Sequence, residues 1–434
     1  MNPPVAVISD SVIALTLVLL LLAPLAIAGV AIINTGLGRS RSAAQALLGN
    51  LAIVAVSAIV FALVGSAFAG SLPGGAGHTF HLAGKSWNWL GEGPILLGGL
   101  SAAPAKAQLS LMFEFLAVGM AALLPWGSGA DRLRLVAGCA IAAVLAAVVF
   151  PVAAWWVWGA GWLNQLGVNF PVKGEAGAGF LDVGGAGVVH LLGGLSAMAV
   201  IWIAGPRRGK FPKEGFSTAM PGHNAAYVLF GCFISLVGWM AWNLAGAILW
   251  MNAPLSALPQ TAVNTVLSAS MALAATFIVT TVRFGKPDAS LCANGWMAGL
   301  VASCACAAVV SPAASMFVGL LAGVATPLLV ELFELALTLD DPSGAVSVHA
   351  AAGLLGLFAA GVFAPKAGQL LAQLVGIATL LGLFLPLVYL LFWGLNRLVP
   401  FRVDADGERI GMDLHELGGG AYPEFVIHRD ESYR

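Results

Sequence analysis

Residues 182–195 read DVGGAGVVHLLGGL, and residues 341–354 read DPSGAVSVHAAAGL. Both stretches match the pattern D-x-x-G-A-x-x-V-H-x-x-x-G-L, in which His190 and His349 follow their aspartates by eight residues. A motif that occurs twice in one chain indicates two related structural units. The positions of these two copies among the helices therefore decide the architecture.

The composition is that of a membrane protein. Of the 434 residues, 59% are hydrophobic and 9% are charged, whereas ordinary soluble domains contain about 25% charged residues. So few charges cannot cover a soluble surface, which excludes a globular cytosolic enzyme, a disordered chain and a nucleic-acid binder with a basic face. The 54 glycines favour close packing between helices in lipid.

The gaps between charged residues are long enough for eleven transmembrane helices, since a crossing needs about 20 apolar residues. The predicted spans are 11–34, 46–69, 107–127, 136–158, 183–205, 223–246, 260–282, 289–309, 313–337, 345–364 and 368–396. The chain is therefore predicted to be an all-α polytopic membrane protein.

The two motif copies lie on the fifth and tenth predicted spans. Five spans separate them, an odd number, so the two segments run in opposite directions through the membrane. This is typical of an inverted repeat, whose pseudo-two-fold axis brings equivalent elements together near the bilayer centre. We expect repeats at about 11–205 and 223–364 and an eleventh helix at 368–396. Together they form a membrane domain, 1–398, followed by a water-facing tail, 399–434.

The basic residues set the orientation. With the N-terminus outside, only four of the 19 Lys and Arg residues lie on the outer side, namely Lys85, Lys106, Lys173 and Lys366. Positive residues concentrate in cytoplasmic loops. We therefore expect a cytoplasmic tail and location in the cell's inner membrane.

His190 and His349 are the histidines that fall well inside predicted spans, where an imidazole needs a hydrogen-bonding partner. The repeat supplies one, because each ring becomes the other's partner, and a neutral pair can share one N–H···N bond and move a proton by tautomer change. Two unrelated core histidines, each bonded to a carbonyl, remain an alternative. A metal site is a further alternative, although two histidines without nearby Cys, Asp or Glu are few for zinc.

Asp182 and Asp341 precede these histidines at the starts of their helices. A carboxylate there accepts hydrogen bonds from free backbone N–H groups and complements the helix dipole. Asp341 is predicted to be a structural cap, and Asp182 a cap with an added electrostatic role toward a cation. The five cysteines lie in apolar runs without a CxxC motif and are predicted to be small core residues. No nucleophile–base set appears inside the spans, so we expect neither an enzyme nor a cofactor.

Taken together, these motifs resemble the ammonium transporter family, which includes Amt, Mep and the Rhesus proteins. The resemblance covers nearly the whole chain. Besides the two histidine motifs it rests on segments 130–134, 238–243, 283–287 and 411–422. It implies a homotrimer in which each protomer has a narrow hydrophobic pore. Ammonium, or its analogue methylammonium, would be recruited and deprotonated at an outer aromatic vestibule, and ammonia would then pass the histidine pair.

The resemblance also implies roles for other residues. Trp158 matches the Trp of the vestibule, Trp239 matches the Trp of the sixth span, and Phe113 matches the first aromatic residue of the third span. For Trp158 an alternative is the aromatic belt at the membrane interface. Vestibule rings would attract the cation by about 0.5–2 kcal/mol each through cation–π contact.

Four positions depart from the family pattern. Ala117 and Trp242 stand where the family usually has two gate phenylalanines, Gly246 where it has an ammonium-binding serine, and Glu114 where it has glutamine. Our hypothesis is that Trp242 fills the volume left by Ala117 and that Glu114 replaces part of the missing polar contact. The alternative for Glu114 is a buried hydrogen bond to a neighbouring helix or protomer.

The tail departs too. The family motif D-x-x-E-H-G-E-x-A-Y is DLHELGGGAY at 413–422, in which the His and the second Glu of the motif are replaced. In the family this tail packs on the cytoplasmic face, where a PII-type signalling protein docks. Two alternative functions stay open on this fold: an ammonium sensor with little flux, and a Rhesus-like gas channel for carbon dioxide.

Overall fold

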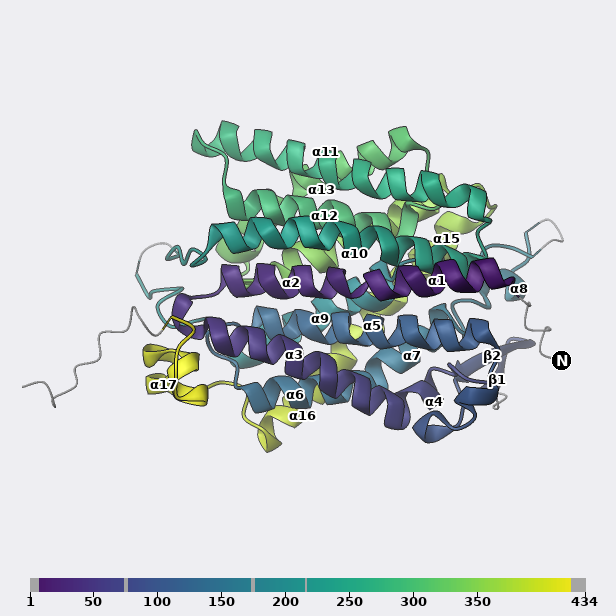
Figure 1. Cartoon of the computed structure of the whole chain (residues 1–434), viewed down its shortest axis with the longest axis horizontal. Helices are drawn as coiled ribbons and strands as arrows, with labels where there is room; N and C mark the ends of the chain where they lie inside the picture. The colour runs from purple at the N-terminus through teal and green to yellow at the C-terminus, as the bar shows by residue number, and fades with distance from the viewer. Residues whose placement is uncertain (1–7, 74–76, 173–175, 215–216, 423–434) are drawn as a thin grey trace, which may run out of the picture.

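The computed structural model describes residues 8–73, 77–172, 176–214 and 217–422. Within these residues it contains 11 helical segments that are long and apolar enough to cross a membrane. They run roughly parallel along the longest axis of the molecule, with the strands β1 and β2 at one end and the helix α17 of the tail at the other (Figure 1). We call these the hairpin end and the tail end. The prediction of eleven spans is confirmed.

The first five spans begin and end close to the predicted positions, and several combine two or more helical pieces. In chain order the pieces are α1 (Asp10–Leu22) with α2 (Pro24–Leu37); η1 (Ser40–Ser42), α3 (Ala43–Val60), η2 (Phe61–Gly65) and α4 (Ser66–Phe68); α5 (Ala105–Ser128); α6 (Leu135–Val144), η5 (Leu145–Val149) and α7 (Phe150–Val157); and η6 (Ala186–Leu191) with α9 (Leu192–Ala204).

The other six spans follow in the same manner. They are α10 (Ala225–Met251); η7 (Leu255–Ala257) with α11 (Leu258–Phe284); α12 (Ala289–Cys306); α13 (Pro312–Glu331) with η8 (Leu332–Ala336); η9 (Ala345–Ala350) with α14 (Ala351–Phe363); and α15 (Gln369–Thr379), η10 (Leu380–Phe384) and α16 (Leu385–Leu398). Short elements outside the spans are β1 (His78–Leu82), β2 (Lys85–Leu90), η3 (Ile95–Leu97), η4 (Leu100–Ala102), α8 (Leu166–Asn169), α17 (Ala405–Ile410) and η11 (Asp413–Leu417).

The antiparallel hairpin of β1 and β2 is a difference from the purely helical prediction. Trp87 of β2 is buried and lies 5.5 Å from the ring of Trp162 and 5.8 Å from the ring of Phe170. An isolated two-stranded hairpin is marginal in water. Here the hairpin is stabilised by packing of Trp87 against the connection 159–172. Because this packing joins segments far apart in the chain, the local sequence did not predict the hairpin.

The two motif copies form the same local structure. η6 and η9 are both π-helical turns, and each follows a glycine with positive φ, Gly185 at 82° and Gly344 at 70°. A left-handed backbone there suits glycine because it has no Cβ. This shared geometry supports the repeat deduced from the sequence, although the boundaries of the two repeats remain a prediction.

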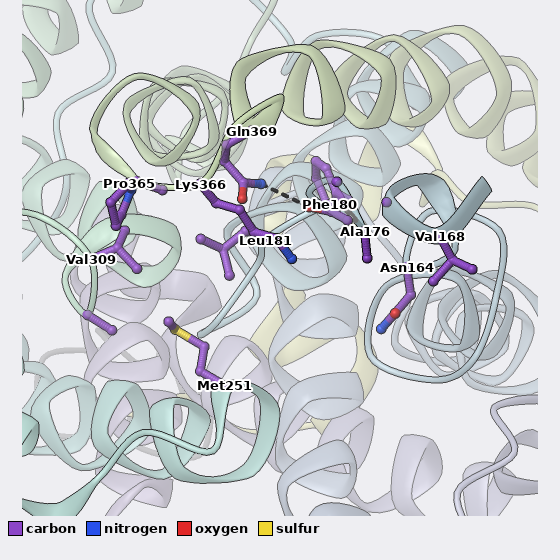
Figure 2. A pocket seen from close by; sticks show the side chains of 15 residues that line it. Asn164, Val168, Ala176, Phe180, Leu181, Met251, Val309, Pro365, Lys366 and Gln369 are labelled. Carbon is purple, nitrogen blue, oxygen red and sulfur yellow. Dashed lines mark hydrogen bonds between the residues drawn. The ribbon is translucent and has the colours of Figure 1, made fainter. Parts of the chain in front are cut away.

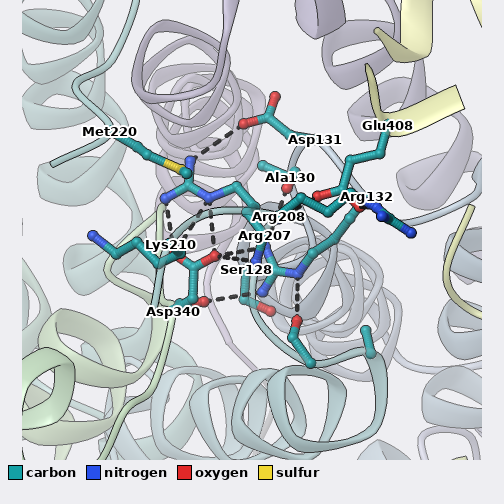
Figure 3. Close-up of polar contacts among 12 residues, drawn as sticks. Ser128, Ala130, Asp131, Arg132, Arg207, Arg208, Lys210, Met220, Asp340 and Glu408 are labelled. Atoms are coloured by element: carbon teal, nitrogen blue, oxygen red, sulfur yellow. Dashed lines mark hydrogen bonds and ion pairs between the residues drawn. The ribbon is translucent and has the colours of Figure 1, made fainter. Parts of the chain in front are cut away.

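Buried charges join the loops at the tail end (Figure 3). Arg207 binds Asp340 at 2.8 Å and Asp131 at 3.2 Å, while Arg132 lies 3.6 Å from Asp340 and donates to the backbone oxygens of Gly205 and Asp340. Burial raises the pKa of the Asp340 carboxyl, but the hydrogen bonds from Arg207 and the charge of Arg132 outweigh burial and lower that pKa to about 2. The loops after the third, fifth and ninth spans are thus held together.

The described part of the tail is packed against the same end. Glu408 of α17 is buried and pairs with Arg208 and Arg402. Asp413 is buried and accepts hydrogen bonds from the backbone N–H groups of Ala44 and Gln45 at the start of α3. The segment was predicted to face water; its exposed residues do so, whereas Glu408 and Asp413 are buried against specific partners.

Candidate functional site

His190 and His349 meet in the interior of the bundle. Their Nδ1 atoms are 3.2 Å apart, and their rings are stacked with centroids 5.2 Å apart and an angle of 27° between the planes. The two residues are only 1% and 4% exposed. The pairing predicted from the motif copies is confirmed, and the alternative of two separate, carbonyl-bonded histidines is wrong.

This geometry fixes what the pair offers to a substrate. A neutral imidazole has one N–H and one bare nitrogen, so one Nδ1 donates and the other accepts. The donating ring then has a bare Nε2, and the accepting ring carries its proton on Nε2. Among the described residues neither Nε2 has a hydrogen-bonding partner, so the pair presents one donor and one acceptor. The two rings can exchange the donor and acceptor roles while both stay neutral, so no net charge enters the apolar interior.

Trp239 of α10 covers His190. The two rings are stacked, with centroids 5.2 Å apart and 13° between the planes. The indole N–H donates to Sγ of Cys304 on α12 at 3.0 Å, and both residues are buried. Cys304 was predicted to be a small core residue, and its contact with Trp239 was not predicted, since nothing in the local sequence places its thiol beside the indole.

Four aromatic rings form a cluster: Phe113 of α5, Trp158 at the end of α7, and Trp242 and Trp250 of α10. The Phe113 ring lies 5.5 Å from Trp158, 5.0 Å from Trp242 and 5.8 Å from Trp250. Trp158 and Trp250 stack face to face at 5.0 Å with 2° between their planes. Three of these residues were predicted, whereas Trp250 was missed. Trp250 lies eleven residues, or about three helical turns, after Trp239 and therefore on the same face of α10, and this spacing could have predicted it.

The segment that leads into η6 anchors this cluster. The indole N–H of Trp158 donates to the backbone oxygen of Asp182 at 2.7 Å, and that of Trp242 donates to the backbone oxygen of Gly184 at 2.8 Å. Oδ2 of Asp182 accepts from the N–H groups of Gly187 and Val188, both at 2.9 Å. These bonds are those of a capping carboxylate. The same segment therefore connects the aromatic rings to the turn that carries His190.

Asp341 makes the equivalent contacts at the other histidine. Its carboxylate accepts hydrogen bonds from the backbone N–H groups of Ala345, Val346 and Ser347 at 2.9 to 3.1 Å. These are free donors at the start of η9, which otherwise would lack a partner. The arrangement is that of a helix cap.

The positions that depart from the family pattern lie close to the cluster in sequence. Ala117 and Glu114 are buried on α5, and Oε2 of Glu114 has no hydrogen-bonding partner among the described residues. Gly246 lies against the backbone of the segment before η6, since a Cβ added there would be 2.3 Å from the oxygen of Val183. Glycine at 246 is thus required by close packing between α10 and this segment.

A separate cavity lies away from these rings, and Figure 2 shows the side chains that line it. It has a volume of about 670 Å³, and its lining includes Asn164, Leu181, Met251, Lys366 and Gln369. The side-chain amide of Gln369 donates a hydrogen bond to the backbone oxygen of Gly179 at 2.9 Å. Neither histidine nor any ring of the aromatic cluster lines this cavity, so it is separate from the site described above.

The described residues contain no group of three or more His, Cys, Asp or Glu side chains that could hold a metal ion.

Comparison with known proteins agrees with this arrangement. The sequence profile described as Ammonium Transporter Family matches residues 13–422. The chain is 32% identical to ammonium transporter Amt2 of Archaeoglobus fulgidus, covering 93% of this chain and 86% of the relative, and 30% identical to Amt2 of Haloferax mediterranei, covering 92% and 87%.

Solved structures have the same fold. A structure described as a sensor Amt protein matches with a TM-score of 0.83 at 25% identity, covering 93% of this chain and 98% of that one. Mep2 of Candida albicans matches with a TM-score of 0.76 at 21% identity, covering 96% and 91%. With a profile that spans nearly the whole chain and a paired-histidine site in its interior, this multi-pass membrane protein belongs to the ammonium transporter family.

Proposed function

We propose that this protein moves ammonium nitrogen across the membrane, taking up ammonium and passing it through the bundle as ammonia. A bare ammonium ion is costly in an apolar interior, whereas ammonia is small and neutral. The observation that carries the proposal is the stacked, hydrogen-bonded pair of His190 and His349. It offers a donor and an acceptor to ammonia where the surroundings are otherwise apolar.

Recruitment would take place at the aromatic cluster of Phe113, Trp158, Trp242 and Trp250. Aromatic faces attract a cation by about 0.5–2 kcal/mol each, more strongly where water is excluded. Potassium and sodium have no proton to lose, so they would meet the apolar interior as charged ions, which is costly. At the outer side of this cluster the ion would give one proton to water, its N–H bond breaking as hydronium forms, and the neutral ammonia would continue to the histidine pair.

The test is flux through purified protein in liposomes. An inward ammonium gradient should acidify or alkalinise the lumen faster than in protein-free liposomes, with the sign depending on whether the proton follows. Methylammonium should be accepted as an analogue. Wild-type liposomes that behave like empty ones would overturn the proposal.

A sensor with little flux is the second candidate. Its support is the similarity to the sensor Amt structure and the tight closure of the aromatic cluster, in which Phe113 and Trp242 are 0% and 1% exposed. Ammonium binding that shifts thermal stability, combined with absent flux, would favour this function over transport.

We also propose that the protein lies in the cell's inner membrane with its tail end facing the cytoplasm. The loops at this end contain Arg39, Arg132, Arg207 and Arg208, and positive residues concentrate in cytoplasmic loops. Fusing a reporter that is active only in the cytoplasm to the C-terminus tests this. Activity is expected from the C-terminal fusion, and activity from an N-terminal fusion alone would contradict the orientation.

Assembly and regulation follow from the family resemblance. We propose a homotrimer, for which native mass spectrometry in a mild detergent should give three times the protomer mass. We propose in addition that a PII-type protein docks on the tail end, where Asp413 and Glu416 hold the tail against α3 and α6. Binding by immobilised protein should be lost when residues 399–434 are deleted.

A further inference from the structure

A cavity at the tail end lies between the start of α6 and the tail. Its volume is about 390 Å³, and it is lined by Arg134, Arg402, Val403, Asp404 and His415. Arg134 directly precedes α6, whereas the other four residues belong to the segment that follows α16. The cavity therefore exists only because the tail packs against the bundle.

The backbone fixes the two arginines of this cavity side by side. The N–H of Arg134 donates to the backbone oxygen of Phe401 at 3.0 Å. Its neighbour Leu133 pairs with Arg402 in an antiparallel bridge. Both guanidinium groups thus start from adjacent positions of one short ladder and reach the same cavity.

Two basic groups of the cavity have no partner. Among the described residues, the guanidinium of Arg134 forms neither a hydrogen bond nor an ion pair, and only the backbone N–H of this residue is bonded. The ring of His415 packs near Gly407, and its nitrogens likewise have no hydrogen bond among these residues. The cavity therefore contains N–H donors that await an acceptor.

Arg402 is already held in the orientation that a ligand needs. Its guanidinium donates to the backbone oxygen of Ala204 at 2.9 Å and to Oε2 of Glu408 at 2.7 Å. Glu408 also pairs with Arg208 at 3.4 Å, so one carboxylate is shared by two guanidinium groups. The positive charge of this pair of arginines is thus only partly compensated.

The other carboxylates around the cavity bind backbone groups. Asp404 caps α17 by accepting from the N–H of Gly407 at 2.6 Å. Glu416 accepts from the N–H of Leu135 at 2.9 Å. Neither forms an ion pair with Arg134, so the charge of this arginine is left for a ligand of opposite sign.

The cavity lies where two spans leave the membrane. Val136, near the start of α6, is 51% exposed, and Leu398, at the end of α16, is 82% exposed. Apolar side chains exposed at the ends of spans are typical of a surface that faces lipid. A ligand in the cavity can therefore carry apolar chains that lie along α6 and α16.

We propose that Arg134, Arg402 and His415 form a binding site for a phosphate group. Guanidinium groups bind phosphate oxygens through two parallel N–H groups, which makes arginine the preferred residue for this anion. Two sources share this chemistry, the headgroup of an anionic phospholipid and free phosphate. The position at the membrane edge favours the headgroup, because basic pockets beside transmembrane helices bind anionic lipids. The site does not depend on ammonium transport.

The first test is native mass spectrometry of the purified full chain with dioleoyl phosphatidylglycerol or dioleoyl phosphatidylcholine. The two lipids have the same chains and a phosphate, but the choline cation is repelled by the arginines. Wild type should bind phosphatidylglycerol more tightly. Arg134→Gln should weaken this binding by about tenfold or more, the effect of one lost charge-assisted hydrogen bond.

Two further variants separate the site from general surface charge. Arg409→Gln removes the same charge from the same end, but Arg409 pairs with Asp406 and does not line the cavity, so binding should match wild type. Arg134→Lys keeps the charge without the planar fork and should bind at an intermediate level. Equal losses in Arg134→Gln and Arg409→Gln overturn the inference.

Thermal unfolding in neutral detergent tests the second source. Without lipid or phosphate, Arg134→Gln should unfold at the wild-type temperature, because its guanidinium has no partner to lose. Inorganic phosphate that raises the unfolding temperature of wild type but not of Arg134→Gln, without any preference for phosphatidylglycerol, identifies free phosphate as the ligand. A wild type with neither the lipid preference nor the phosphate shift overturns the inference, whether or not the protein conducts.

Discussion

Nδ1 of His190 lies 3.2 Å from Nδ1 of His349, although 159 positions separate the two residues in the chain. Two π-helical turns make this contact, each after a left-handed glycine and each capped by an aspartate. The pairing of Nδ1 with Nδ1 turns both Nε2 atoms away from the shared bond. The orientation of the rings, and with it the supply of one donor and one acceptor, therefore depends on the backbone around each turn.

The contact between Trp239 and Cys304 should matter for transport. Cys304→Ala removes the acceptor of the indole N–H and frees the ring that covers His190, so flux should fall by about twofold to tenfold. Cys304→Ser keeps an acceptor of similar size and should retain most of the flux. If the alanine and serine variants were equally active in liposomes, the thiol would have no positioning role.

The aromatic cluster should control ammonium capture. Trp242→Ala removes a ring that contacts Phe113, and the concentration for half-maximal methylammonium uptake should rise about threefold or more, the value of one cation–π contact. Glu114→Gln should raise it too if the carboxyl group assists capture. Unchanged uptake in both variants would refute the hypothesis that these residues rebuild the vestibule.

Restoring a serine at position 246 should not restore a binding hydroxyl. The Cβ of Gly246→Ser would lie 2.3 Å from the backbone oxygen of Val183, so α10 and the segment before η6 must separate. Overpacking of this kind costs about 1–3 kcal/mol. We expect a lower thermal unfolding temperature in detergent and no gain in ammonium affinity. A stable variant with tighter binding would contradict the packing described here.

The charge cluster at the tail end should make the free energy of unfolding depend on pH. The pKa of Asp340 is about 2 in the folded protein, below its ordinary value of 3.8. The unfolded chain therefore binds more protons, and the contribution of Asp340 is complete above about pH 4 and lost as the pH falls toward 2.

Asp340→Asn leaves Arg132 without its paired carboxylate and Arg207 with Asp131 alone, and should cost about 3–5 kcal/mol at neutral pH. Thermal unfolding from pH 7 to pH 2 measures both effects. Asp406→Asn is the control, since among the described residues Asp406 pairs with exposed Arg409 alone. Parallel pH profiles for wild type and Asp340→Asn would show that this carboxylate does not link stability to pH.

Periodic and repeated features of the sequence predicted much of this structure. The eleven spans follow from the spacing of charges, because a bilayer imposes a minimum apolar length. The histidine pair follows from two equal motifs on antiparallel spans. The first inference needs only the order of residues along the chain, and the second needs only the symmetry of the repeat. Neither requires knowledge of side-chain packing.

The remaining contacts arise between helices that share no local pattern. Cys304 meets Trp239 only because α12 packs on α10, and Trp158 at the end of α7 stacks on Trp250 of α10 although the two lie far apart in the chain. The role of Gly246 likewise depends on how closely a neighbouring backbone approaches. Such contacts depend on tertiary packing, which a single sequence does not specify.

The most direct test of the central claim is ammonium flux in liposomes that contain equal amounts of wild type, His190→Ala or His349→Ala. Each substitution removes one ring of the pair, so flux should fall by about tenfold or more, in line with the loss of at least one hydrogen bond along the path. His81→Ala, on the exposed strand β1, should conduct like wild type. Full flux in both pair variants, with wild type active, would contradict passage past His190 and His349.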